Sequence, residues 1–183
     1  MKNFGGGGGI NVGPLTGLSA NYTIEFYFKW DYAYVDYLGN LFYAQEAAFA
    51  RSFLVDHGLS PATYRVNYAV RKGNGDWAEI ITPADSVLGN DQWHHLAFTR
   101  NWDGANTSFA IYVDGNVAAS SSFAGGFWEP GLDVLLPFGA AGSMDGTLDE
   151  IRFSNVARTD FGVPEPATMT ILLIGAGLLI RRK

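Results

Sequence analysis

The sequence predicts an all-β fold, a two-sheet antiparallel sandwich of jelly-roll type, followed by a short C-terminal hydrophobic helix. Three observations lead to this fold class. Aromatic residues make up 15% of the 183-residue chain and glycine occurs 23 times, which suits strands joined by many turns. Several segments alternate apolar and polar side chains with period two, as half-buried strands do. Turn-forming pairs containing glycine, asparagine or aspartate separate these segments.

The clearest strand covers residues 22–30, where the alternation continues along the whole segment. One face of this strand presents Ile24, Phe26 and Phe28, and the other presents Thr23, Glu25 and Tyr27. Further β-like segments are residues 48–56, 64–71, 77–82, 93–101, 109–113, 116–122, 134–138 and 147–154. The weak helical candidate at residues 45–50 is too short to change the fold class.

The strongest local prediction is a hairpin at Asp114-Gly115. This pair lies between two apolar segments, and both residues tolerate the positive φ angles that a two-residue hairpin turn requires. Turns are also predicted at 39–40, 73–75, 89–90, 103–104 and 145–146.

Composition excludes several classes of function. The chain has no cysteine, so it has no disulfide, thiolate metal site or cysteine nucleophile. Its net charge is −6, and residues 1–162 alone hold 9 basic and 17 acidic side chains. This acidic balance disfavours a nucleic acid as partner.

The chain divides into a domain at residues 1–162 and a tail at residues 163–183. The tail contains Pro164-Glu165-Pro166, an uncharged segment at 167–180 and a terminal Arg181-Arg182-Lys183. As a helix, residues 167–180 would be about 21 Å long, shorter than the ~30 Å hydrocarbon core of a bilayer. The basic cluster favours the cytoplasmic side, which places the domain outside the cytoplasm.

The tail resembles the PEP-CTERM sorting signal of Gram-negative bacteria, in which the three parts occur in this order. The resemblance implies that an exosortase in the inner membrane recognises Pro164, Glu165 and Pro166. It implies passage through the inner membrane and then export to the cell surface or extracellular matrix. Met1 leads into Gly5–Gly9 without an apolar signal segment, so we expect the natural protein to begin upstream.

Four segments of the domain resemble a known family. Residues 22–30 are similar to its "T-I-E-x-W" strand, 92–99 to "W-H-H-V-A", 109–115 to "L-x-x-Y-V-D-G" and 146–154 to "G-x-I-D-E-V-R-I". These are marks of the laminin G-like, or concanavalin A-like, jelly roll. Residues 4–12 resemble its first strand. The fold hosts lectins, glucanases, adhesion modules and spacers, so it does not by itself define function.

Catalytic chemistry is disfavoured by spacing. Hydrolases of this fold carry a motif that resembles "E-x-D-x-x-E" on one strand. In this chain Asp149 and Glu150 are adjacent, and a regular strand sends adjacent side chains to opposite faces. His94 and His95 diverge for the same reason. The domain is therefore predicted not to be an enzyme. A separate expectation is structural: Glu25 and Arg152 lie on two of the predicted strands and are expected to form an ion pair across the sheet.

The family resemblance implies a calcium site near the last strand, with Asp149 as ligand and Asp145 as a second candidate. Oxygen ligands suit this hard cation. Trp102 and Trp128 lie beside turn residues and are candidates for stacking on sugars, with capping of the sandwich ends as the alternative.

The sequence therefore predicts an exported, non-enzymatic binding or adhesion module with polysaccharide as the expected ligand. Two alternatives stay open: a divergent glycan hydrolase or lyase on the same fold, and a purely structural protein of the matrix.

Overall fold

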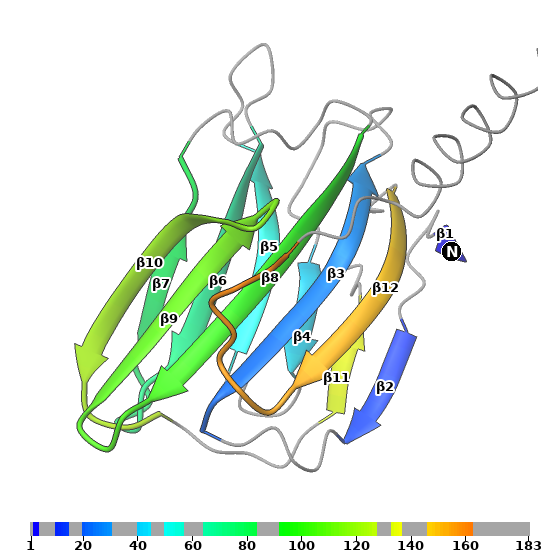
Figure 1. Ribbon diagram of the computed structural model, residues 1–183. Coiled ribbons are helices and arrows are strands. Elements are labelled where there is room, and N and C mark those ends of the chain that lie inside the picture. Colours follow the sequence, from blue (N-terminus) through cyan, green and yellow to red (C-terminus); the bar gives the residue numbers. More distant parts are fainter. Residues whose placement is uncertain are drawn as a thin grey trace, which may run out of the picture.

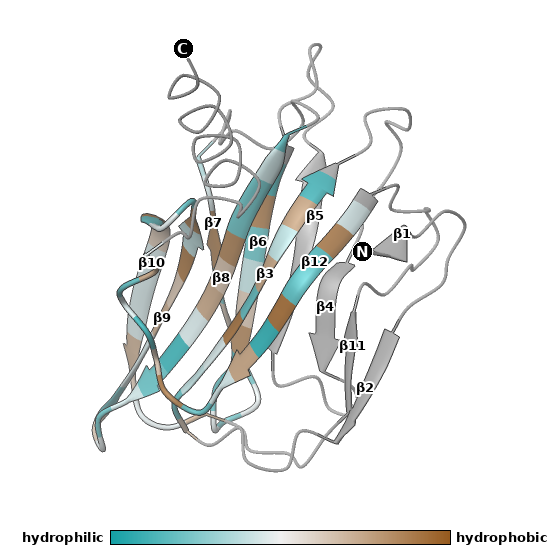
Figure 2. Ribbon diagram, turned by 45° about the vertical axis from the view of Figure 1, so that its right-hand side comes forward, coloured by the Kyte–Doolittle hydropathy of each residue, from teal (hydrophilic) through white to brown (hydrophobic). Residues whose placement is uncertain are grey.

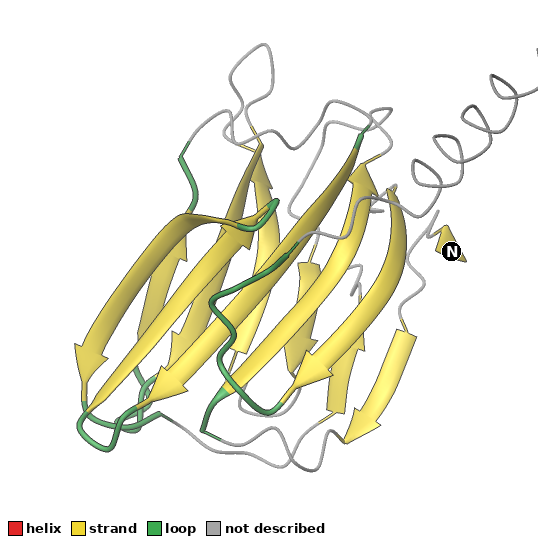
Figure 3. Ribbon diagram, viewed as in Figure 1, coloured by secondary structure: helices red, strands yellow, loops and turns green. Residues whose placement is uncertain are grey.

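A computed structural model describes residues 2–3, 10–14, 20–30, 40–44, 50–56, 64–83, 92–127, 133–136 and 146–162. These residues form two six-stranded antiparallel sheets packed face to face, as the fold class predicts (Figures 1 and 3). They contain strands, turns and loops but no helix, and hence none long and apolar enough to span a membrane. The predicted tail helix lies outside the described residues.

Sheet A has the strand order β1-β12-β3-β8-β9-β10. Its strands are β1 (Lys2–Asn3), β3 (Tyr22–Trp30), β8 (Trp93–Trp102), β9 (Asn106–Val113), β10 (Asn116–Ala124) and β12 (Gly146–Ser154). Sheet B has the order β2-β11-β4-β5-β6-β7. It consists of β2 (Ile10–Pro14), β4 (Asn40–Ala44), β5 (Ala50–Asp56), β6 (Tyr64–Arg71), β7 (Trp77–Ile81) and β11 (Asp133–Leu136).

The core lies between the sheets and combines aromatic with aliphatic side chains. The alternation predicted for β3 is confirmed, because Ile24, Phe26 and Phe28 are buried in this core. Figure 2 shows the same alternation of hydropathy along β3 and β12. The ring of Phe98 on β8 lies 5.5 Å from that of Tyr68 on β6. Such ring contacts stabilise the packing of the two sheets beyond the area they bury.

The β9–β10 hairpin forms where Asp114-Gly115 predicts it. Asp114 has φ 49° and Gly115 has φ 79°, the left-handed conformations that this turn requires. The Asp114 carboxylate also accepts a hydrogen bond from the backbone N–H of His95, at 2.9 Å. The turn residue therefore connects the hairpin to β8 as well.

The short strand β1 (Lys2–Asn3) was not predicted, and two further differences concern β4 and β12. β4 (Asn40–Ala44) was not predicted, because its apolar residues form a short continuous run without alternation. β12 contains a bulge: Asp149 lies opposite Tyr27 while Arg152 lies opposite Glu25, and Glu150 has φ 48°. The prediction for Asp149 and Glu150 assumed a regular strand. The bulge shows that the strand is irregular between Asp149 and Arg152.

Candidate functional site

A groove of about 650 Å³ crosses the outer face of sheet A, over β8, β9 and β10. Its floor and walls combine hydroxyl, amide, aromatic and small apolar groups. The lining residues are Thr99, Asn101, Ser108, Phe109, Ala110, Tyr112, Val117, Ser120, Ser121, Ser122, Ala157 and Thr159.

Small side chains in register across three strands create this hollow. Asn101 lies opposite Ser108, which lies opposite Ser122. In the next row Ala110 lies between Thr99 on β8 and Ser120 on β10. Because these side chains are short, the surface is recessed, and most of them present a hydrogen-bonding group.

Of the described residues that line the groove, none carries a formal charge. A charged ligand would lose hydration there without gaining a partner ion, which is unfavourable. A neutral ligand rich in hydroxyl groups matches the donors and acceptors present.

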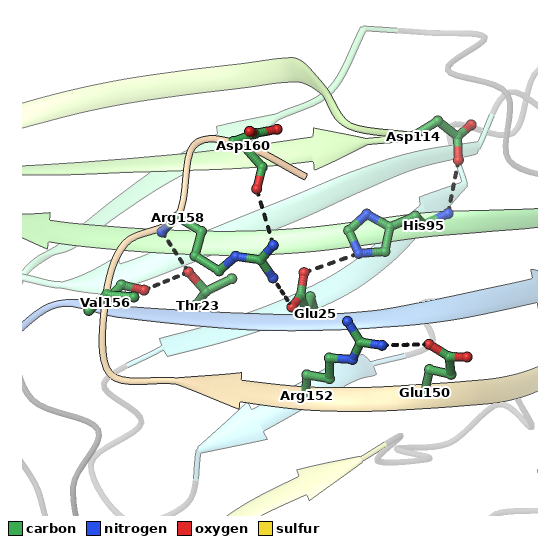
Figure 4. Close-up of polar contacts among 9 residues, drawn as sticks. All are labelled: Thr23, Glu25, His95, Asp114, Glu150, Arg152, Val156, Arg158 and Asp160. Carbon is green, nitrogen blue, oxygen red and sulfur yellow. Dashed lines mark hydrogen bonds and ion pairs between the residues drawn. The ribbon is translucent and has the colours of Figure 1, made fainter. Parts of the chain in front are cut away.

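One wall of the groove belongs to the segment after β12, residues 155–162, which we call the strap. The strap runs over the outer face of sheet A (orange in Figure 1), and its Ala157 and Thr159 line the groove. The Thr23 hydroxyl holds it to β3: this group donates to the Val156 carbonyl at 2.7 Å and accepts from the Arg158 N–H at 2.9 Å (Figure 4).

Arg158 forms the main polar attachment of the strap. Its guanidinium pairs with the Glu25 carboxylate and donates to the Asp160 carbonyl at 3.1 Å (Figure 4). Glu25 is almost fully buried, and its second carboxylate oxygen lies 3.2 Å from His95 Nε2. A buried carboxylate requires such partners, so the Glu25 site favours a docked strap.

Aromatic packing completes the attachment. The Phe161 side chain is buried, and its ring centroid lies 4.6 Å from that of Tyr112 and 5.5 Å from that of His95. The Arg158 guanidinium lies over the same ring at 5.0 Å. Because Tyr112 also lines the groove, this packing connects the strap directly to the groove.

The predicted Glu25–Arg152 pair is wrong, although the two residues do lie opposite each other on β3 and β12. Arg152 instead pairs with Glu150 at 2.8 Å, since the bulge lets both lie on the outer face. Glu25 is engaged by Arg158 and His95. The cavity among these groups has about 20 Å³, enough for roughly one water molecule.

The two histidines diverge as predicted, each with a polar partner. His94 Nδ1 lies 2.8 Å from the Asp114 carboxylate, whereas His95 Nε2 faces Glu25 on the outer face. Burial lowers the pKa of His95 below its ordinary value, despite the opposing effect of Glu25. The Nδ1 atom of His95 is buried without a partner among the described residues.

One of the two predicted calcium ligands, Asp149, lies within the described residues. Asp149 is half-buried, and its Oδ1 accepts a hydrogen bond from the Glu150 N–H at 3.0 Å. Asp145 lies outside the described residues. Among the residues that are described, no three His, Cys, Asp or Glu side chains gather to hold a metal ion. One carboxylate is not a six- to eight-oxygen cage, so calcium stays a prediction.

The other predicted site residues lie away from the groove or outside the described part of the chain. Trp102 ends β8, half-buried, with its ring 6.3 Å from that of Phe127. It does not line the groove. Trp128 and the tail residues Pro164, Glu165 and Pro166 lie outside the described ranges.

The chain belongs to the concanavalin A-like lectin/glucanases superfamily, because a laminin G model of that description matches residues 4–162. This confirms the fold family expected from the four segments. No curated protein matches the chain significantly.

Solved structures with a similar fold include binding proteins. The CBM40 of the Ruminococcus gnavus IT-sialidase, bound to α2,6-sialyllactose, has a TM-score of 0.56 at 14% identity and covers 86% of this chain and 93% of its own. The binding domain of botulinum neurotoxin DC, in complex with SialylT, has a TM-score of 0.64 at 9% identity, covering 94% of this chain. This chain spans about two fifths of the botulinum neurotoxin DC and G domains, 41% and 38%. At these identities the likeness establishes the fold alone.

Proposed function

We propose that this protein is a non-enzymatic carbohydrate-binding module that holds a neutral glycan in the groove over β8, β9 and β10. The observation that carries the proposal is the recessed, uncharged lining, with hydroxyl groups from Thr99, Ser108 and Ser120. Sugar hydroxyls exchange hydrogen bonds with such groups, and a volume of this size accommodates one or two sugar rings.

Two similar structures give general support, because they hold sialyllactose and SialylT as bound partners. The uncharged lining of the present groove favours a neutral sugar over a sialylated one. A hydrolase would require two carboxylates beside the bound sugar, and no described carboxylate lines this groove.

Titration of the full chain with a panel of neutral and sialylated oligosaccharides tests this function. Ser108→Tyr fills the groove, and we expect it to weaken binding of the best neutral ligand at least tenfold. Asn106→Tyr is the matched control, since Asn106 is an exposed residue on the same strand that does not line the groove. Absence of binding to every neutral glycan, or equal effects of the two variants, overturns the proposal.

We further propose that the tail delivers the module to the surface or matrix of a Gram-negative cell through exosortase recognition of Pro164, Glu165 and Pro166. Replacing all three by alanine is expected to retain the chain in the inner membrane. Cell fractionation with mass spectrometry of the mature C-terminus checks this. Recovery of the intact native chain from the cytosol contradicts it.

A further inference from the structure

Strand β10 forms one edge of sheet A, where a further strand could pair. It is the last strand of the sheet order and lies at the left margin of the molecule in Figure 1. It is nine residues long, from Asn116 to Ala124, and pairs with β9 along one side. On its other side, no described residue hydrogen-bonds to the backbone of this strand.

β10 lacks most of the devices that protect sheet edges. Its sequence is NVAASSSFA, with no charged residue and no proline. Edge strands usually carry lysine, proline or inward charges that prevent pairing with another chain. The single irregularity is a bulge between Val117 and Ala119, so Ala119–Ala124 remains a regular strand, in which Ser120–Ser122 and Ala124 are exposed.

We infer that β10 pairs antiparallel with β10 of a second copy of this chain, joining two copies of sheet A into one continuous sheet. The sequence of β10 favours a second copy as the occupant, because its apolar and hydroxyl residues are arranged almost symmetrically about Ser121. The chain carries a net charge of −6, and an uncharged seam lets two acidic molecules meet without like charges in contact.

Side-chain matching selects one register, centred on Ser121. Directly opposed residues must point to the same face, so only residues of the same parity pair. Centring on Ser121 places Ala119 opposite Phe123 and Ser120 opposite Ser122, apolar against apolar and hydroxyl against hydroxyl. A register centred on Ser122 instead places Phe123 opposite Ser121, an apolar residue against a hydroxyl, so the match is lost.

The pairing has a consequence for the groove. Ser120 and Ser122 line the groove and also lie on the strand at the seam, so the grooves of the two copies face the same side. If the proposed function holds, such a dimer presents two adjacent glycan sites. The pairing itself requires no glycan.

The natural absence of cysteine allows a direct test on the full chain. Two copies of Ser121→Cys lie directly opposite each other in this register, within the 4.4–6.8 Å Cα separation that a disulfide requires. We expect this variant to form disulfide-linked dimers at least tenfold faster than Ser108→Cys. Ser108 is also an exposed serine, one strand further in, so association through the tail affects both variants alike.

A second variant tests the edge itself. Adding Ser120→Lys to Ser121→Cys places like charges at the seam, and we expect the crosslinking rate to fall to that of Ser108→Cys. Equal rates for Ser121→Cys and Ser108→Cys, or a rate that the added lysine does not lower, overturn the inference. The assay contains no carbohydrate, so its outcome is independent of the proposed function.

Discussion

The attachment of the strap by Arg158 gives the most demanding prediction. Arg158→Met keeps an unbranched apolar stem but removes the guanidinium and its charge, leaving the buried Glu25 carboxylate with His95 as its remaining described partner. Breaking a buried pair by removing one partner costs about 3–5 kcal/mol. The Arg158 side chain is 34% exposed, so solvent weakens this pair, and we expect a loss of about 2 kcal/mol in the free energy of unfolding.

Urea unfolding followed by circular dichroism measures this loss. For a chain of this size it corresponds to about 4–8 °C in Tm. Adding Glu25→Gln removes the unpaired charge, so the double variant should lose at least about 1 kcal/mol less than the sum of the single variants. Arg158→Met should also weaken glycan binding, because Ala157 and Thr159 form a groove wall. The proposed attachment of the strap is refuted if Arg158→Met lowers the free energy of unfolding by less than about 0.5 kcal/mol. It is also refuted if the loss in the double variant equals the sum of the losses in the single variants.

Three further predictions concern the surroundings of the groove. Because burial lowers the folded-state pKa of His95, the unfolded chain binds more protons below about pH 6.5, so stability should fall as the pH drops from 7 to 5. Urea unfolding at both pH values checks this, and an identical pH dependence in His95→Gln would contradict it. Asp114→Ala should lower the free energy of unfolding by about 1–3 kcal/mol, because it removes two hydrogen bonds and places alanine at a positive φ. Asp114→Asn should lower it less, and equal losses for the two variants in denaturant titrations would contradict this role of the turn. If Asp149 holds calcium, the ion should raise the Tm of the native chain but not that of Asp149→Asn. A Tm that does not change with calcium in calorimetry would contradict the calcium site.

The local elements were predictable where the side-chain pattern alone determines them. The alternation in 22–30 predicts β3 with its observed bounds, and Asp114-Gly115 predicts the β9–β10 turn. The sequence also placed Glu25 and Arg152 on the two strands that turn out to be neighbours. These features follow from period-two patterning and turn chemistry, which act over a few residues.

The site was not predictable from the same patterns. Arg158 lies in an irregular segment, so no periodicity indicated that it would reach Glu25 in place of Arg152. The groove exists because Ala110, Ser108 and Ser120 are small and lie in register on neighbouring strands. Small residues form no motif, and the only signal available was the serine-rich segment 120–122 beside a predicted hairpin. The groove forms only when strand pairing brings these serines beside the small residues of β9 and β8.

The central claim is that a neutral sugar occupies the groove. Amide chemical-shift mapping during titration with the best neutral oligosaccharide tests it residue by residue. We expect the largest shifts at Asn101, Ser108, Ala110 and Ser120, with smaller shifts in the strap. Shifts concentrated near Trp102 and Phe127 instead, or no shifts at saturating sugar, would contradict it.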